Sequence, residues 1–184
     1  MWGFFLRLLA LLAIMLSTIQ PMIFIDPITP ANTHLFRQIR LRALQESPSA
    51  FCSTYATEFA FDEAEWARRV ERWGGEQGIG FLAMDADRPC GLAGGLVQPG
   101  NRAQLVSMWT APEYRRQRVG RLLVESVAEW AVGRGLQLLT LMVTSVNEPA
   151  IRFYESLGFI RTGGSEPYPN DPALMEWEMA RRLD

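Results

Sequence analysis

Residues 105–135 of the chain read LVSMWTAPEYRRQRVGRLLVESVAEWAVGRG. A strand-like run ends at Thr110, a loop with Pro112 follows, and an arginine-rich turn opens a segment whose apolar residues recur at helical spacing. The first backbone N–H groups of a helix have no partner inside it, and the helix dipole adds partial positive charge at that end. This segment therefore predicts an anion-binding strand–turn–helix unit.

The turn adds full positive charges to those amides. Its guanidinium groups belong to Arg115, Arg116, Arg118 and Arg121. The planar fork of arginine matches pairs of phosphate oxygens, so the turn suits a ligand with several phosphates, such as coenzyme A. Gly120 lets the backbone come close to that ligand.

The flanking sequence predicts one mixed α/β domain. Helical spacing of apolar residues indicates helices, and short β-branched or alternating runs bounded by turn residues indicate strands. The expected helices are residues 32–45, 62–73, 119–132 and 147–157, and the expected strands are residues 23–28, 79–84, 91–97, 104–110, 137–143, 159–162 and 174–179.

A second motif lies downstream of the turn. Residues 143–163 read VTSVNEPAIRFYESLGFIRTG, with Asn147, Ala150, Tyr154, Gly158 and Phe159 at the spacing Asn-x-x-Ala-x-x-x-Tyr-x-x-x-Gly-Phe. This block, together with RRQRVG at residues 115–120, resembles the GNAT superfamily of N-acetyltransferases. The resemblance covers the chain from about Ile23 to its C-terminus.

One position departs from the family pattern. The family signature at the turn is Arg or Gln, two residues, Gly, one residue, then Gly or Ala, and Arg118 stands where the inner glycine is usual. This substitution implies either a more strained turn or a turn whose backbone is ordinary at that point.

The resemblance implies a GNAT-like fold, with a mostly antiparallel sheet of six to seven strands flanked by about four helices. It also implies acetyl transfer from acetyl-CoA to a primary amine through a ternary complex, with no metal. The residues it places at the cofactor are Met108, Trp109, Thr110, Arg115, Arg116, Gln117, Arg118, Val119, Gly120, Arg121, Asn147 and Tyr154.

The chemistry needs three groups. An amine with a pKa of ~10.4 must lose a proton before it attacks a thioester. The oxyanion needs a backbone N–H, which in the resembling family lies on the strand at Ser107–Thr110. The leaving thiolate needs a proton, and Tyr154 is the family-matched donor. Asn147 and Tyr154 are seven residues apart and share a helix face, although Tyr154 also fits a plain core aromatic.

The strand LVSMWT carries no carboxylate, so the general base must come from another segment or act through water. Glu58 is the candidate, alongside Tyr55 and the loop at residues 165–170. The alternative for the acids near the second helix is a solvent-facing role on caps and loops; these acids are Glu58, Asp62, Glu63 and Glu65. Three tryptophans either shape the acceptor pocket or belong to the core, namely Trp66, Trp73 and Trp109.

The remaining features concern the size of the domain, its partners and its location. The 184-residue chain has a net charge of -2, which predicts one folded domain without a nucleic-acid partner. A single histidine and two separated cysteines give no metal motif. Residues 22–184 form the expected domain, and the apolar residues 1–21 are an extension outside the fold, a membrane anchor or, as the weakest interpretation, an export signal.

Two other functions compete with acetyl transfer. One is a coenzyme A-binding regulatory module without turnover, and the other is a nucleotide-binding protein that uses GGEQGIG at residues 74–80 as a phosphate loop. For the enzyme we expect a small-molecule or peptide amine acceptor and a monomer or homodimer. We expect it in the cytoplasm, where acetyl-CoA is available, with membrane association only if residues 1–21 are an anchor.

Overall fold

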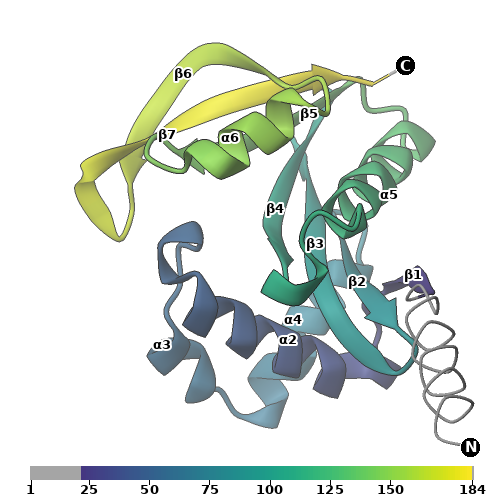
Figure 1. Cartoon of the computed structure of the whole chain (residues 1–184). Coiled ribbons are helices and arrows are strands. Elements are labelled where there is room, and N and C mark those ends of the chain that lie inside the picture. Colours follow the sequence, from purple (N-terminus) through teal and green to yellow (C-terminus); the bar gives the residue numbers. More distant parts are fainter. Residues whose placement is uncertain (1–21, 184) are drawn as a thin grey trace, which may run out of the picture.

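The computed structural model describes residues 22–183, which form a seven-stranded sheet in the order β1-β2-β3-β4-β5-β7-β6 (Figure 1). The strands are β1 (Ile23–Pro27), β2 (Gly78–Asp85), β3 (Arg88–Gln98), β4 (Arg102–Thr110), β5 (Leu138–Thr144), β6 (Ile160–Tyr168) and β7 (Asp171–Arg182). The helices are α2 (Thr33–Glu46), α3 (Tyr55–Phe59), α4 (Glu63–Gly74), α5 (Val119–Gly133) and α6 (Glu148–Glu155). The predicted mixed sheet flanked by helices is confirmed.

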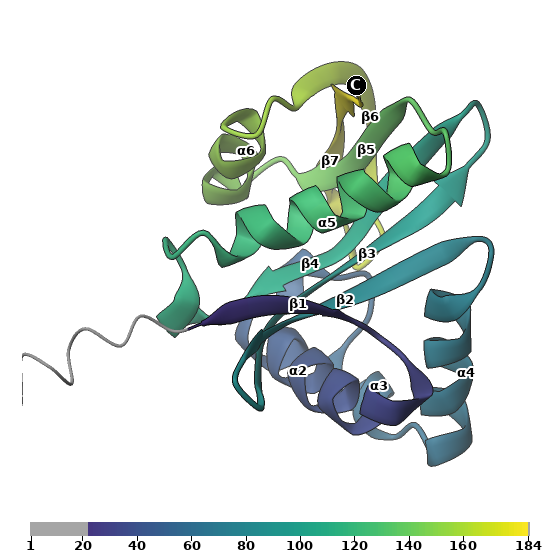
Figure 2. The same ribbon diagram turned by 90° about the vertical axis from the view of Figure 1, so that its right-hand side faces the viewer.

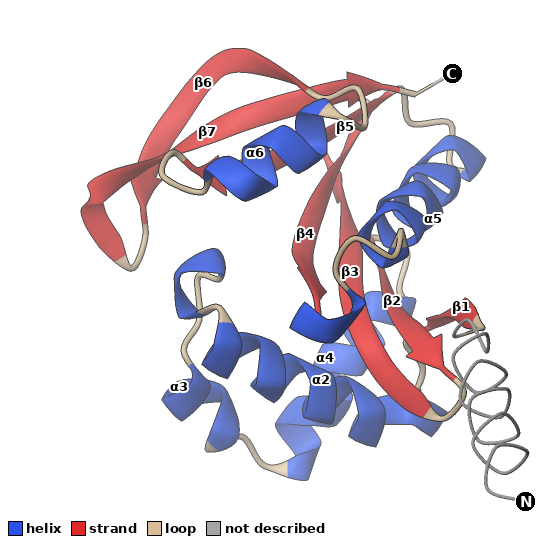
Figure 3. Cartoon of the chain, in the orientation of Figure 1, coloured by secondary structure: helices blue, strands red, loops and turns tan. Residues whose placement is uncertain are grey.

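The pairing of β4 with β5 interrupts an otherwise antiparallel sheet. Strands β1 to β4 form an antiparallel meander, and β7 lies antiparallel between β5 and β6. The parallel strands β4 and β5 pair only where Arg102–Gln104 meets Leu138–Thr140. Beyond that point the two strands separate, as Figure 3 shows, and we call residues 105–110 and 141–144 the β4–β5 opening.

Two apolar cores cover the two faces of the sheet (Figure 2). The first contains buried residues of α5 and α6, and the second contains buried residues of α2 and α4. Neighbouring glycines in β3 make room on opposite faces: a Cβ on Gly94 would collide with Trp73 of α4, and a Cβ on Gly95 would lie 2.8 Å from Trp130 of α5. A helix therefore packs closely on each side of the same strand.

Helix boundaries follow the capping residues closely. Asp62 caps α4 by accepting a hydrogen bond from the Glu65 N–H at 2.8 Å, and Asn147 caps α6 by accepting one from the Ala150 N–H at 3.3 Å. Asn32 precedes α2 without capping it, because its carboxamide accepts from the Thr29 N–H at 2.8 Å and donates to the Pro27 carbonyl at 2.9 Å. Asn32 therefore fixes the chain between β1 and α2.

Two segments differ from the sequence-based expectation. The short helix α3 was not predicted, and β6 and β7 extend well beyond the expected residues 159–162 and 174–179. Residues of β6 up to Pro167 are exposed, so this edge strand lacks the apolar alternation on which strand prediction depends. Within residues 22–183 no helix has both the length and the apolar character needed to cross a membrane. The expectation for residues 1–21 lies outside the described residues.

Candidate active site

A β-bulge marks the inner end of β4. Trp109 pairs with Leu92 and Val106 pairs with Gly94, so Ser107 and Met108 together face one residue of β3. Ser107 has a left-handed backbone, with φ 55°. A bulge interrupts the hydrogen-bond ladder and redirects the strand, and here it does so at the β4–β5 opening. It lies within the strand segment from which the family resemblance implies an oxyanion donor.

The turn that follows has an unusual backbone. Arg116 and Arg118 adopt φ values of 63° and 66°, in the left-handed region that non-glycine residues seldom occupy. Arg118 thus takes up a glycine-like conformation at the position where the family pattern has glycine, which is the strained alternative. Helix α5 begins directly afterwards with no side-chain cap and no acidic residue in its first turn. Its first amides therefore keep their anion-binding capacity.

The arginines of the turn divide into two groups. Arg115 is engaged, because its Nη2 lies 2.7 Å from Glu46 Oε2 and its Nε donates to the Thr110 carbonyl at 3.0 Å. Burial would raise the pKa of Glu46, but hydrogen bonds from Ser47, Trp109 and Arg115 lower that pKa below its ordinary value. This ion pair fastens the turn to α2.

The other guanidinium groups are less constrained. Arg116 and Arg118 are exposed and make no ion pair with any residue between 22 and 183. Arg121 donates to the Ser156 carbonyl at 3.5 Å, and Gln117 donates to the Glu113 carbonyl at 2.6 Å. The cationic groups available to an anionic ligand are therefore chiefly those of Arg116 and Arg118.

Gly120 has a packing role that the sequence did not reveal. A Cβ at this position would lie 3.0 Å from Met108 Cε and 3.1 Å from Phe153 Cζ. The missing side chain lets α5 approach both the bulge and α6. Val119 is 1 % exposed and belongs to the core below the turn, so its backbone alone is available to a ligand.

Tyr154 lies on α6 and is 9 % exposed. Its ring packs against Phe153 and Phe159, with centroid separations of 5.2 and 5.7 Å. Burial raises the pKa of the Tyr154 phenol, so this group carries its proton at neutral pH. A protonated phenol fits a proton donor, and the surrounding rings equally fit a core aromatic. Asn147, seven residues before it, uses its Oδ1 atom to cap α6.

Glu58 is not the solvent-facing acid that its sequence position suggested. It is 0 % exposed, and Arg40 binds both its oxygens, at 2.7 Å and 3.0 Å, while Arg69 Nη1 lies 3.4 Å from Oε1. Burial acts to raise the pKa of Glu58, but the hydrogen bonds and charge of Arg40 outweigh it and lower the pKa. Asp62 and Glu63 are exposed, as a surface role predicts.

Arg40 connects this buried ion pair to the bulge. Its Nη1 lies 3.5 Å from Ser107 Oγ, and its guanidinium carbon lies 4.6 Å from the centre of the Phe51 ring. Arg40 has no distinguishing signal in the sequence, because an arginine beside the apolar stripe of a helix resembles any surface cation. Its burial becomes apparent only when α3 brings Glu58 against α2.

The aromatic candidates near the acceptor side are mostly structural. Trp66 and Trp109 are 1 % and 4 % exposed and lie in the core on the α2 face, which confirms the core interpretation for both side chains. Trp109 Nε1 donates to Glu46 at 2.9 Å. The Tyr55 ring stacks on Phe59 at a centroid distance of 5.3 Å. Residues 165–168, expected in a loop, belong to β6 instead.

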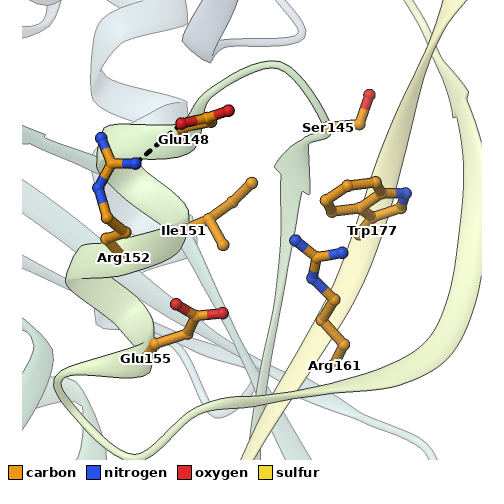
Figure 4. Close-up of a pocket in the computed structure, with 7 residues that line it drawn as sticks. All are labelled: Ser145, Glu148, Ile151, Arg152, Glu155, Arg161 and Trp177. Carbon is orange, nitrogen blue, oxygen red and sulfur yellow. Dashed lines mark hydrogen bonds and ion pairs between the residues drawn. The ribbon is translucent and has the colours of Figure 1, made fainter.

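A small pocket of about 200 Å³ lies between α6, β6 and β7 (Figure 4). Inside it the Arg161 guanidinium stacks 3.6 Å from the centre of the Trp177 ring, and Glu148 pairs with Arg152 at 2.8 Å. Ligand pockets usually measure ~300 Å³ or more. Neither Tyr154 nor the arginine turn lines this pocket, so we do not assign it to the reaction. In the part of the chain that the structure describes, no three His, Cys, Asp or Glu side chains gather as metal ligands.

Comparison with curated proteins places the chain among acetyltransferases. Mycothiol acetyltransferase of Thermomonospora curvata is 32% identical over 106 residues, which are 58% of this chain and 35% of that protein. Ribosomal protein bS18-alanine N-acetyltransferase of Escherichia coli is 41% identical over 59 residues, 32% of this chain and 40% of that protein. The matched segments thus span well under two thirds of either relative.

Solved structures share the fold over most of the chain. The ribosomal-protein-S18-alanine N-acetyltransferase of Escherichia coli matches with a TM-score of 0.64 and 24% identity, over 89% of this chain and 95% of that one. The PaiA N-acetyltransferase of Thermoplasma acidophilum, solved in complex with coenzyme A, matches with a TM-score of 0.66 and 14% identity, over 87% and 98%. The sequence profile of the Acetyltransferase (GNAT) family matches residues 41–159, more than half of the 184 residues. The chain therefore belongs to the GNAT acetyltransferase family.

Proposed function

We propose that this protein transfers the acetyl group of acetyl-CoA to a primary amine, by direct attack in a ternary complex. The observation that carries the proposal is the arrangement around the β4–β5 opening. A β-bulge at Ser107 and Met108 lies beside an uncapped helix start that carries Arg116 and Arg118. The coenzyme A complex of a protein with the same fold supports this choice of cosubstrate.

Binding depends on the turn in this proposal. The first amides of α5 receive the diphosphate, and Arg116 and Arg118 add charge-assisted hydrogen bonds to its oxygens. Arg115 stays paired with Glu46 and supports the turn instead of contacting the ligand. The Asn147 carboxamide nitrogen faces no hydrogen-bond partner among residues 22–183, so it is available to an amide carbonyl of the cosubstrate.

The chemistry uses the bulge and the buried phenol. An N–H group of the bulge stabilises the oxyanion that forms on the acetyl carbonyl, a contribution of ~3 kcal/mol for one donor. Tyr154 protonates the departing thiolate, since its phenol is neutral at pH 7. Glu58 acts through Arg40, which it holds beside Ser107. Its lowered pKa and its two engaged oxygens fit this positioning role better than that of a base.

The names of the relatives indicate the acceptor class. They are a mycothiol acetyltransferase, a ribosomal protein bS18-alanine N-acetyltransferase and a streptothricin acetyltransferase of Streptomyces lavendulae. We therefore expect a small-molecule or peptide amine. Because acetyl-CoA is the cosubstrate, we expect the protein to act in the cytoplasm.

Thiol release tests the proposed activity. The full chain is incubated with acetyl-CoA and an acceptor panel that contains an alanine-initiated hexapeptide, kanamycin and putrescine, and free coenzyme A is followed with a thiol reagent. The chain has no lysine, so its own amine background is limited to the N-terminus. Amine-dependent release supports the proposal. Thermal stabilisation by coenzyme A without release would favour the second candidate.

That second candidate is a coenzyme A-binding module without turnover. The observation that favours it is the engagement of Glu58, because no carboxylate lies on β4 and the one predicted base is bound by arginine. A carboxylate with a suitable pKa near the β4–β5 opening would remove this objection.

A further inference from the structure

Glu176 is a largely buried residue of β7 with 8 % of its surface exposed. No group among residues 22–183 forms a hydrogen bond or an ion pair with its side-chain carboxylate. Burial and the neighbouring charge of Glu166 raise the pKa of Glu176 above its ordinary value. An ionisable group held in this way costs stability unless a ligand partners it.

Glu166 makes that cost larger. It occupies the position of β6 directly opposite Glu176 in the antiparallel pair. Like charges in such a pair repel each other, because side chains of directly opposed residues lie on the same face of the sheet. Within the described sequence neither carboxylate has an ion-pair partner. A cation bound beside them would offset the repulsion.

The two carboxylates lie in the β6–β7 hairpin. The β6–β7 hairpin is tied to the segment after α2, because Tyr168 donates its hydroxyl to the Phe51 carbonyl at 2.8 Å; Figure 1 shows the hairpin reaching toward this segment. Glu176 neighbours Thr144, the last residue of β5. Thr144 Oγ1 in turn donates to the Ser49 carbonyl at 3.5 Å. Glu176 therefore lies at the β5 side of the β4–β5 opening.

The Cys52 thiol senses the charges of this region. Partial burial raises its pKa, the charges of Glu176 and Glu166 raise the pKa further, and the charge of Arg40 lowers it. Arg40 itself reaches Ser107 Oγ at 3.5 Å. Tyr154 lies in the core on the α5 face, whereas Ser49, Phe51 and their neighbours lie on the α2 face. Proton removal and proton donation would thus occur on opposite sides of the opening.

We propose that Glu176 takes the proton from the ammonium group of the acceptor, and that Glu166 beside it attracts this cation. The inference rests on the acetyl transfer proposed above and names its base. The acceptor class is a primary ammonium without a neighbouring carboxylate, such as a peptide N-terminus or an alkylamine. A free amino acid would place a third negative charge beside the first two.

Each proton and electron pair in the proposed step passes between named groups. The ammonium nitrogen gives one proton to the Glu176 carboxylate, and its freed electron pair forms the C–N bond at the acetyl carbonyl. The C–S bond then breaks, the sulfur leaves with the electron pair and takes the proton of Tyr154, and the nitrogen's second proton returns to the phenolate. Glu176 releases its proton to water. The products are the amide, the coenzyme A thiol and one proton.

Glu176 suits this step better than Glu58 does. A general base works best when its pKa lies near the pH at which it operates. Burial and Glu166 move the pKa of Glu176 upward, toward neutrality, whereas the ion pair with Arg40 moves the pKa of Glu58 downward. The ionisable groups that interact electrostatically with Glu176 are Glu166, which lies opposite it on β6, Tyr168 of β6 and Cys52 of the loop after α2.

Substitution of Glu176→Gln tests the inference, with Glu178→Gln as the matched control two residues along the same strand. For the best acceptor of the panel we expect kcat/KM at pH 7 to fall about 10²-fold or more in E176Q and to change less than about threefold in E178Q. With putrescine as acceptor, the E176Q rate should rise about tenfold per pH unit between pH 7 and pH 9, because an alkylamine with a pKa of ~10.4 loses its proton in solution. The wild-type rate should rise less steeply.

Stability separates this loss from misfolding. The raised pKa of Glu176 means that its ionisation opposes folding at neutral pH, so E176Q should melt at or above the wild-type temperature. A variant that is at least as stable but has lost activity supports the proposal. An E176Q enzyme with wild-type kcat/KM and an unchanged pH profile overturns it while leaving the acetyltransferase proposal intact. A wild-type protein that acetylates no amine of the panel overturns both.

Discussion

At the scale of single residues, the proposed role of Tyr154 can be tested separately from its packing. Replacement by phenylalanine keeps the ring that packs against Phe153 and Phe159 and removes only the hydroxyl. We expect Tyr154→Phe to lower kcat about 10²-fold, the typical effect of a lost general acid, with little change in KM for acetyl-CoA. Steady-state thiol release measures both constants.

The matched control for that variant is Tyr114→Phe. Tyr114 donates its hydroxyl to Asp85 at 2.6 Å, a bond that raises the pKa of this phenol to about 12 and joins the turn to β2. The Tyr114→Phe variant should retain most of the wild-type kcat. If kcat fell equally in both variants, Tyr154 would have a packing role only.

Arg118 combines backbone strain with a positive charge. Its left-handed conformation, with φ 66°, costs a residue with a side chain ~1 kcal/mol relative to glycine. Arg118→Gly and Arg118→Ala both remove the guanidinium, but only glycine relieves the strain. We therefore expect the glycine variant to be more stable than the alanine variant by about 1 kcal/mol, measured by chemical denaturation. Equal stabilities would mean that the turn is unstrained in solution.

At the scale of elements, a buried ion pair holds the three helices of the α2 face together. Glu58 of α3 binds Arg40 of α2 and lies 3.4 Å from Arg69 of α4. Removing one partner of a buried pair leaves an uncompensated charge, so we expect Glu58→Gln to lower the free energy of unfolding by about 3 kcal/mol at pH 7. The exposed Glu63→Gln variant should lose less than about 0.5 kcal/mol.

The pH dependence of this loss follows from the lowered pKa of Glu58. A carboxyl group whose pKa falls on folding stabilises the protein above its ordinary pKa of 4.5, and that contribution is lost as the pH falls through the folded-state value. The difference between wild type and Glu58→Gln should therefore be largest near pH 7 and shrink below about pH 4. Denaturation curves at several pH values measure it; a constant difference would contradict the charge-based explanation.

The elements that were predicted well are those whose signals are local. Helices α4 and α6 begin where Asp62 and Asn147 cap them, and periodic apolar residues carry α5. Strand β6 and the bulge at Ser107 depend on pairing across the sheet, which one sequence does not display. The arginine turn was predicted before α5 because its signal is local. The ion pair between Arg115 and Glu46 was not anticipated, because it joins residues far apart in the sequence.

At the scale of the whole molecule, the surroundings of the proposed base could be predicted least. The charged groups there come from α2, α3, β6 and β7, and Arg40 and Glu58 alone are 18 residues apart. Glu176 lies in the alternating run LMEWEM, a pattern that predicts a solvent-facing glutamate side chain on a strand. In the folded chain Glu176 is buried, and the β6–β7 hairpin that carries it lies against the segment at Phe51.

The two halves of the sheet are joined at β4 and β5 by three residue pairs, so a ligand that contacts both halves should stabilise the whole molecule. Coenzyme A at about 100 times its Kd is expected to add about 2.7 kcal/mol to the free energy of unfolding. Adenosine at the same concentration lacks the diphosphate and should shift the melting temperature far less. A double replacement of Arg116 and Arg118 by alanine should shrink the coenzyme A shift and its dependence on salt, because both are exposed cations at the start of α5. An undiminished shift in that variant would place the diphosphate away from the turn.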